Sequence, residues 1–151
     1  MPLSGFAHDV VRLLATEDMT KSEQQAREWR ILVYSEYAQK TLLPILAKSQ
    51  PDIIYERYSV LSYPGVELAK QLQIPLVLEV NAPLWQEKTK YRGLVLRRTA
   101  EELERKVLNA ADALIVVSAA LADYARQLKV PEDSINVLPN GVDRERFHRQ
   151  G

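Results

Sequence analysis

The sequence contains no cysteine and only two histidines among its 151 residues. The missing thiols exclude disulfide frameworks, cysteine-ligated zinc, iron–sulfur clusters and thiol nucleophiles. His8 lies near the start of the chain and His148 near its end, and neither follows a well-defined strand. Surface histidines are therefore the expectation, rather than acid–base catalysis. We expect no metal site and no cofactor.

Long hydrophobic runs and an excess of either charge are also missing. No apolar run approaches the ~18 residues of a membrane-spanning helix. The 20 Lys and Arg residues balance 20 Asp and Glu residues, which argues against a nucleic-acid partner. The first residues lack the basic start and apolar core of a secretory signal. We therefore expect one cytoplasmic domain.

Four short runs of aliphatic and β-branched residues predict strands. They cover residues 52–56, 76–80, 113–117 and 135–138. Continuous apolar runs such as Leu114 to Val117 are typical of strands covered on both faces, as in a parallel sheet between helix layers. A weaker strand is predicted over Val10 to Leu14.

Stretches with helical spacing separate these runs and predict an α/β fold with right-handed crossovers. The first runs from Ser22 to Ser49, is amphipathic through residues such as Leu32, Val33 and Leu42, and is expected to kink or break at Pro44. The others cover residues 60–73, 94–109 and 119–128. Ser118 is a suitable N-cap for the last of them.

Polar residues just past the strands are the first candidates for a site, because ligands of open α/β sheets bind at the carboxyl ends of the strands. This set could hydrogen-bond a hydroxyl-rich ligand, with a guanidinium able to grip a phosphate or carboxylate. Each residue also has a structural interpretation, as a helix cap, a turn or a local ion pair. The candidates are Glu56, Arg57, Tyr58, Asn81, Ser118, Asn140 and Gly141.

A basic segment without acidic residues follows the second strand. It mixes cations with apolar residues, which suits an anionic membrane surface or a phosphorylated lipid acceptor. The alternative is a solvated helix start whose leucine and valine side chains pack inward. Its cations are Lys88, Lys90, Arg92, Arg97 and Arg98.

Neither glycine-rich phosphate-binding motif, G-x-G-x-x-G or G-x-x-x-x-G-K-[ST], occurs in the sequence. A nucleotide site within these residues alone is therefore not expected. Glu79 and Glu87, like Glu28 and Glu36, have an E-x₇-E spacing. Among 13 glutamates, roughly one such pair arises by chance, so the spacing carries little weight.

Four blocks in order resemble the amino-terminal domain of family 4 glycosyltransferases, which are retaining GT-B enzymes. The blocks are residues 51–59, 74–83, 111–118 and 137–143. The resemblance implies a Rossmann-like half that binds the acceptor and faces a second half that binds a nucleotide sugar. It also implies a partial domain over residues 1–143, the start of an interdomain linker over 144–151, and truncation at both ends.

Two departures from the family pattern limit this resemblance. Many relatives place a histidine after the strand that matches residues 76–80, whereas this chain has Asn81, whose amide cannot act as a base near neutral pH. The family's first strand and its glycine-rich loop are not found. A sheet without that strand is expected to expose an edge that pairs with another chain or aggregates.

Two functions from different classes remain open. In the first, the chain is the acceptor-side portion of an enzyme that transfers a hexose from a nucleotide sugar to a glycan, lipid or small-molecule acceptor. This portion would be active only with a donor-binding domain. In the second, the chain is an inactive truncated fragment that acts at most as a binding module. The first would be cytoplasmic, at the inner face of the membrane. A small flavodoxin-like or receiver-like domain is a weaker third interpretation.

Overall fold

The computed structural model describes residues 5–18, 22–143 and 146. Its four strands form one parallel sheet in the order β1-β2-β3-β4. They are β1 (Ile54–Arg57), β2 (Leu76–Val80), β3 (Ala113–Val116) and β4 (Ile135–Val137). The predicted α/β class with a parallel sheet is confirmed, and the four strands lie within two residues of their predicted bounds.

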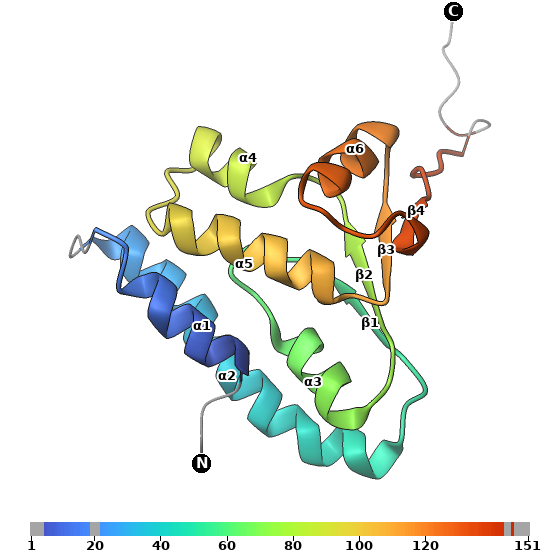
Figure 1. Ribbon diagram of the computed structural model, residues 1–151, viewed down its shortest axis with the longest axis horizontal. Coiled ribbons are helices and arrows are strands. Elements are labelled where there is room, and N and C mark those ends of the chain that lie inside the picture. The colour runs from blue at the N-terminus through green and yellow to red at the C-terminus, as the bar shows by residue number, and fades with distance from the viewer. Residues whose placement is uncertain (1–4, 19–21, 144–145, 147–151) are drawn as a thin grey trace, which may run out of the picture.

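The helices between the strands lie on one face of the sheet. Consecutive strands are neighbours in the sheet, and right-handed crossovers between parallel neighbours place every helix on the same side. Figure 1 shows α3 and α5 on the near side of the strands. The helices are α3 (Pro64–Leu72), α4 (Leu84–Tyr91), α5 (Arg97–Ala110) and α6 (Ala119–Gln127).

The core fills the space between this face and its helices. Leu76, Leu78 and Leu114 point into it and are fully buried. On the opposite face Tyr55 is 58% exposed, and Val77 is only partly buried. The expectation that helices cover both faces is therefore wrong for the described part of the chain, because all three crossovers turn to the same side.

Two further helices, α1 (Gly5–Leu14) and α2 (Glu23–Ser49), pack outside α5 and α3. The strand predicted over Val10 to Leu14 is therefore wrong. Val10 and Leu14 are both buried whereas Val11 is exposed, which is the four-residue spacing of one helix face. The run is too short for its composition alone to separate strand from helix.

Helix α2 begins after Ser22, whose side chain accepts a hydrogen bond from the Gln25 amide, and continues through Pro44. Of the kink or break expected at Pro44, the break is therefore wrong, because one helix covers residues 23–49. Proline removes one hydrogen bond to the carbonyl four residues earlier, here that of Lys40. Both residues are exposed, so water can solvate the freed carbonyl.

Two of the other predicted helices begin later than their hydrophobic spacing suggested. Leu61 has a positive φ of 65°, which is not compatible with a right-handed helix that begins at Val60. Helix α3 starts instead at Pro64, where proline suits the first helical position. Gly93 has a φ of 68° and separates α4 from α5. The basic segment is therefore a short helix of its own, joined by a turn to the start of α5.

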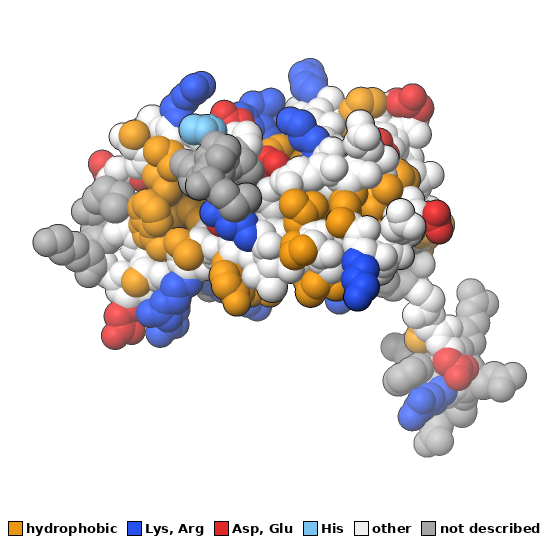
Figure 2. Space-filling view, turned by 90° about the horizontal axis from the view of Figure 1, so that it is seen from below, with side chains coloured by type: hydrophobic (Ala, Val, Ile, Leu, Met, Phe, Trp, Pro, Cys, Tyr) orange, Lys and Arg blue, Asp and Glu red, His pale blue; other side chains and the backbone are white. Residues whose placement is uncertain are grey.

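The outer side of α1 and α2 is strongly apolar, against the predicted amphipathic pattern. Val33 and Leu42, predicted for the apolar core face, are exposed, whereas Gln25, Glu28 and Gln39 are buried. Figure 2 shows hydrophobic side chains gathered on this side of the molecule. The exposed apolar residues of the two helices are Val11, Val33, Tyr34, Tyr37, Leu42 and Ile45.

Residues 144–151, predicted as the start of a linker, lie outside the described residues apart from Arg146. The Arg146 amide donates a hydrogen bond to the Asp143 carboxylate. Among the helices of the described residues, none combines the length and the hydropathy needed to span a bilayer.

Candidate functional site

The carboxyl ends of β1 and β2 bring two charged side chains together on the uncovered face of the sheet. Arg57 and Glu79 are register partners on the two strands. The Arg57 Nε lies 3.2 Å from Glu79 Oε1. The Arg57 side chain is 70% exposed and that of Glu79 is 20% exposed. The pair is therefore open to a ligand at this edge of the sheet.

Two more side chains bind the same carboxylate. The Tyr55 hydroxyl donates to Glu79 Oε2 at 2.5 Å, and Asn81 Nδ2 donates to Oε1 at 2.8 Å. Tyr55 and Arg57, like Glu79 and Asn81, are two residues apart, so alternation along each strand places all four on one face. We call these four residues the Glu79 cluster.

The cluster holds Glu79 in its charged form. Hydrogen bonds from Tyr55 and Asn81, and the charge of Arg57, lower the pKa of Glu79. The carboxylate in turn raises the pKa of the Tyr55 hydroxyl through the hydrogen bond between them. The site therefore presents a fixed carboxylate, a guanidinium, an amide and a phenol ring.

The candidates predicted from the sequence include Arg57 and Asn81 but not Tyr55 or Glu79. Those candidates are residues at the expected strand ends, whereas the carboxylate that joins Arg57 and Asn81 lies inside β2. The two-residue alternation of Tyr55 with Arg57 and of Glu79 with Asn81 was the available signal.

Glu56 faces the opposite way, toward the covered face of the sheet. It accepts a hydrogen bond from the backbone of Gly65, and burial raises the pKa of its carboxyl. A Cβ at Gly65 would lie 1.8 Å from Glu56 Oε2, so any larger residue there would displace this carboxylate. Glu56 thus supports the start of α3 and is separated from Arg57 by the sheet.

The other predicted strand-end residues do not join the cluster. Tyr58 is buried, and burial together with Glu104 raises the pKa of its hydroxyl. Ser118 caps α6 by accepting from the Leu121 amide, which confirms its predicted capping role. Asn140 and Gly141 are exposed in the coil after β4.

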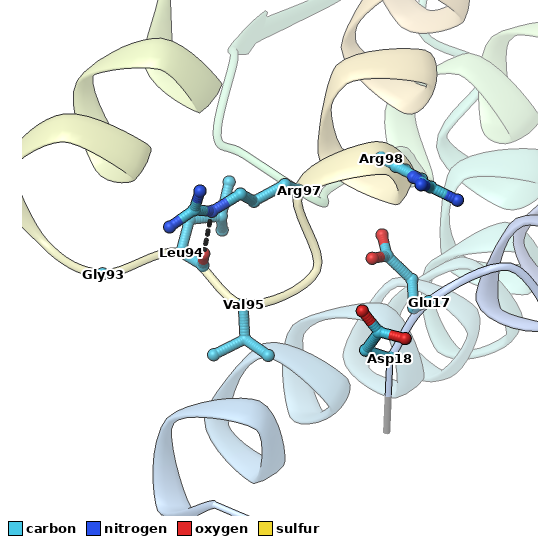
Figure 3. Close-up of a pocket in the computed structure, with 7 residues that line it drawn as sticks. All are labelled: Glu17, Asp18, Gly93, Leu94, Val95, Arg97 and Arg98. Atoms are coloured by element: carbon cyan, nitrogen blue, oxygen red, sulfur yellow. Dashed lines mark hydrogen bonds between the residues drawn. The ribbon is translucent and has the colours of Figure 1, made fainter. Parts of the chain in front are cut away.

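Three of the five basic residues, Lys90, Arg97 and Arg98, have different partners. The Lys90 ammonium lies 5.0 Å from the centre of the exposed Tyr91 ring. In Figure 3, Arg97 and Arg98 diverge at the start of α5. Arg97 Nε donates to the Leu94 carbonyl, and Arg98 reaches the Thr16 carbonyl.

The hollow in Figure 3, of about 450 Å³, is lined by both arginines, and Arg98 lies on the side of the acidic residues whereas Arg97 points away from them. Its acidic wall comes from Glu17 and Asp18, so its charge is mixed. Three amides, two just before α5 and one in its first turn, already have carboxylate partners. The buried Glu28 accepts from Val95 and Leu96, and Glu17 accepts from Thr99. These three amides are therefore not open to an anion in the hollow.

The Glu79 cluster is suited to binding hydroxyl groups. A carboxylate accepts hydrogen bonds, a guanidinium donates them, and an amide does both. The exposed ring of Tyr55 adds an apolar surface with a polar end. An ionised carboxylate held by three donors is a poor proton donor at neutral pH, so the cluster can position a ligand rather than protonate it.

Comparison with known proteins assigns the chain to a family. The profile of Glycosyltransferase Family 4 matches residues 11–146. Two curated glycogen synthases, from Mycobacterium tuberculosis strains CDC 1551 / Oshkosh and H37Rv, are each 28% identical over 102 residues. The match covers 65% of this chain and 24% of each relative, so the chain spans about a quarter of their length. With a parallel Rossmann-like sheet and a profile match over most of its residues, the chain belongs to glycosyltransferase family 4.

Proposed function

We propose that the chain is the acceptor-side portion of a retaining GT-B glycosyltransferase and that the Glu79 cluster binds the acceptor. The observation that carries this proposal is the convergence of Tyr55, Arg57 and Asn81 on the Glu79 carboxylate at the carboxyl ends of two parallel strands. This edge is where open α/β sheets bind their ligands.

The enzyme would transfer a hexose from a nucleotide sugar to a glycan, lipid or small-molecule acceptor. Of these three acceptor classes, the glycan is supported by the name of the two relatives, glycogen synthase. The nucleotide sugar would bind a donor domain outside residues 1–151. The cluster would contribute by orienting an acceptor hydroxyl, which is where much of the rate enhancement of such transfers arises.

A transfer assay tests this proposal in a protein that joins residues 1–151 to a family 4 donor domain. We expect hexose transfer to a glycan acceptor, and we expect Arg57→Ala and Asn81→Ala to raise KM for the acceptor at least tenfold with KM for the donor unchanged. The matched control is Lys90→Ala, which lies outside the cluster. Equal activity of all three variants would contradict the assignment of the site.

We also propose that α4 contacts an anionic lipid surface at the cytoplasmic face of a membrane. Lys90, Tyr91 and Arg92 are exposed on this helix and the turn after it, and Lys88 is partly buried there, where burial lowers its pKa. Arg97 and Arg98 are held by backbone carbonyls, and Arg98 also lies beside acidic residues. Sedimentation with vesicles of anionic lipid should fall for the triple variant Lys88→Ala, Lys90→Ala, Arg92→Ala and change little for Arg97→Ala, Arg98→Ala.

The alternative, an inactive module that binds a partner through a sheet edge, is favoured by one observation. β1 is an edge strand, and Ile53 just before it and Tyr55 within it are 50% and 58% exposed. Free edges with apolar side chains pair readily with other strands. Sedimentation velocity would show concentration-dependent association, and Ile53→Lys should abolish it. A monomer at all concentrations would remove this alternative.

A further inference from the structure

A buried carboxyl group joins three helices at the carboxyl end of the sheet, on the covered side. Glu104 of α5 is completely buried. The Tyr124 hydroxyl of α6 donates to Glu104 Oε1 at 2.5 Å, and the Trp85 backbone amide donates to Oε2 at 3.2 Å. The Trp85 indole Nε1 donates to the Tyr124 hydroxyl at 2.9 Å, which closes the triangle.

The Glu104–Tyr124–Trp85 hydrogen bonds join helix α4 to its neighbours α5 and α6. None of its residues is fully buried, and its side chains Leu84 and Trp85 pack against the core only in part. Trp85 lies in the first turn, where amides have no partner within the helix. The Glu104 carboxylate therefore supplies the hydrogen bond that this amide would otherwise lack, and Tyr124 fixes the indole.

The surroundings of Glu104 contain hydrogen-bond donors but no counterion. The groups that act on it are the hydroxyls of Tyr58 and Tyr124 and the Trp85 amide. Farther away, Glu56 acts on Tyr58 and Glu101 acts on Tyr124, and both are acidic. Among the ion pairs of the described residues, none includes Glu104. Ionisation of this carboxyl is therefore opposed by burial and compensated only by neutral donors.

We propose that Glu104, Tyr124 and Trp85 form a proton-sensitive latch that holds α4 against α5 and α6, most firmly when Glu104 is protonated, and loosens as that proton is lost. The proposal concerns α4 alone and does not depend on the proposed transferase function.

The direction of the effect follows from proton linkage. Burial raises the pKa of Glu104 to about 7, from 4.5 for an ordinary glutamate. With α4 released, the carboxyl would be solvated and would titrate at its ordinary value. Closure is therefore most favourable below pH 4.5, weakens as the pH rises to about 7, and is constant above that. The whole change in the closing equilibrium is on the order of 100-fold.

Hydrogen exchange of Trp85 in the full 151-residue chain tests the latch. Both the backbone amide and the indole N–H of Trp85 report on it, and Trp29→Phe identifies the indole signal. Protection, corrected for the intrinsic exchange rate at each pH, should fall on the order of 100-fold between pH 4.5 and 7 and then level off. The amides of Leu78 and Val80 in β2 should keep their protection, because the opening is local.

Three variants separate the latch from general loss of structure. Glu104→Gln keeps the shape but cannot titrate, so protection of Trp85 should no longer depend on pH. Tyr124→Phe should lower protection of the indole at every pH. Glu101→Gln, an exposed carboxyl one turn earlier on α5, should behave like the parent protein. A pH-independent parent, an unchanged pH profile in Glu104→Gln, or equal losses at Trp85 and Leu78 would each overturn the proposal.

Discussion

Arg57 and Glu79 face each other across neighbouring parallel strands, 3.2 Å apart, on the one face of the sheet that no described helix covers. Tyr55 and Asn81 bind the same carboxylate from the same face. The position of the pair makes it accessible, and its hydrogen bonds fix its charge. Both properties are needed to recognise hydroxyl groups of a ligand.

The hydrogen bond from Tyr55 is expected to control the titration of Glu79. In Tyr55→Phe the pKa of Glu79 should rise toward its ordinary value of 4.5, because the largest cause of its depression is removed. A depressed carboxyl contributes stability that is present above pH 4.5 and lost as the pH falls through the folded pKa. The variant should therefore show a smaller loss of stability in acid. A carboxyl ¹³C NMR titration measures the pKa directly.

Tyr91→Phe is the matched control for that titration. Tyr91 is also exposed, but it lies next to Lys90 rather than a carboxylate. An identical Glu79 titration in the parent protein and in Tyr55→Phe would show that the hydroxyl does not bind the carboxylate in solution.

Glu28 of α2 should contribute strongly to the free energy of unfolding, although the first amide that it binds lies 67 residues later in the chain. Its carboxylate accepts the amides of Val95 and Leu96 at the start of α5. Glu28→Ala leaves buried donors unsatisfied and should lower the free energy of unfolding by about 2–3 kcal/mol. Urea denaturation measures this change in the free energy of unfolding. Glu28→Gln, which keeps one acceptor oxygen, should lose less, and the exposed Glu23→Ala should lose almost nothing.

Much of the fold could be predicted from the sequence because its strands are bounded by clear turn signals. β2 was predicted over its full extent, and the cap at Ser118 was found because a hydroxyl stands immediately before an apolar helix. The run from Val10 to Leu14 failed because five residues fit a strand or one helical turn. The uncovered face could not be predicted, since it depends on the spatial order of the strands.

The site was predicted in part for a similar reason. Arg57 and Asn81 were found from their positions after the strands, whereas Glu56 and Tyr58 were grouped with them although their side chains lie elsewhere. The two-residue alternation along β1 separates Glu56 and Tyr58 from Arg57, but which side chains of β1 and β2 lie opposite each other depends on register. Register was available only from the pairing of β1 with β2.

Gly65 and Glu56 are expected to be energetically coupled. Gly65→Ala places a methyl group against the Glu56 carboxylate, at a distance that real contacts do not reach. The free energy of unfolding should fall by about 1–3 kcal/mol, as for other overpacked positions. In a Glu56→Ala background the same change should cost much less, because the clashing oxygens are gone. A double-mutant cycle by urea denaturation measures this coupling, and strict additivity would contradict it.

The cap of α6 provides a simpler test of local structure. Ser118→Ala removes the acceptor for the Leu121 amide and should cost about 1 kcal/mol. Thermal or urea denaturation is sufficient to detect this loss. Gln127→Ala, an exposed change at the other end of the same helix, should leave stability nearly unchanged.

Ligand binding by the 151-residue chain, followed by NMR on its backbone amides, tests the central claim most directly. With a short glucan as the probe, we predict shifts confined to the residues around Tyr55, Arg57, Glu79 and Asn81. Arg57→Ala should abolish these shifts, and a nucleotide sugar should not reproduce them. A glucan that leaves these amides unchanged while the chain remains folded would contradict the assignment of the Glu79 cluster as the acceptor site.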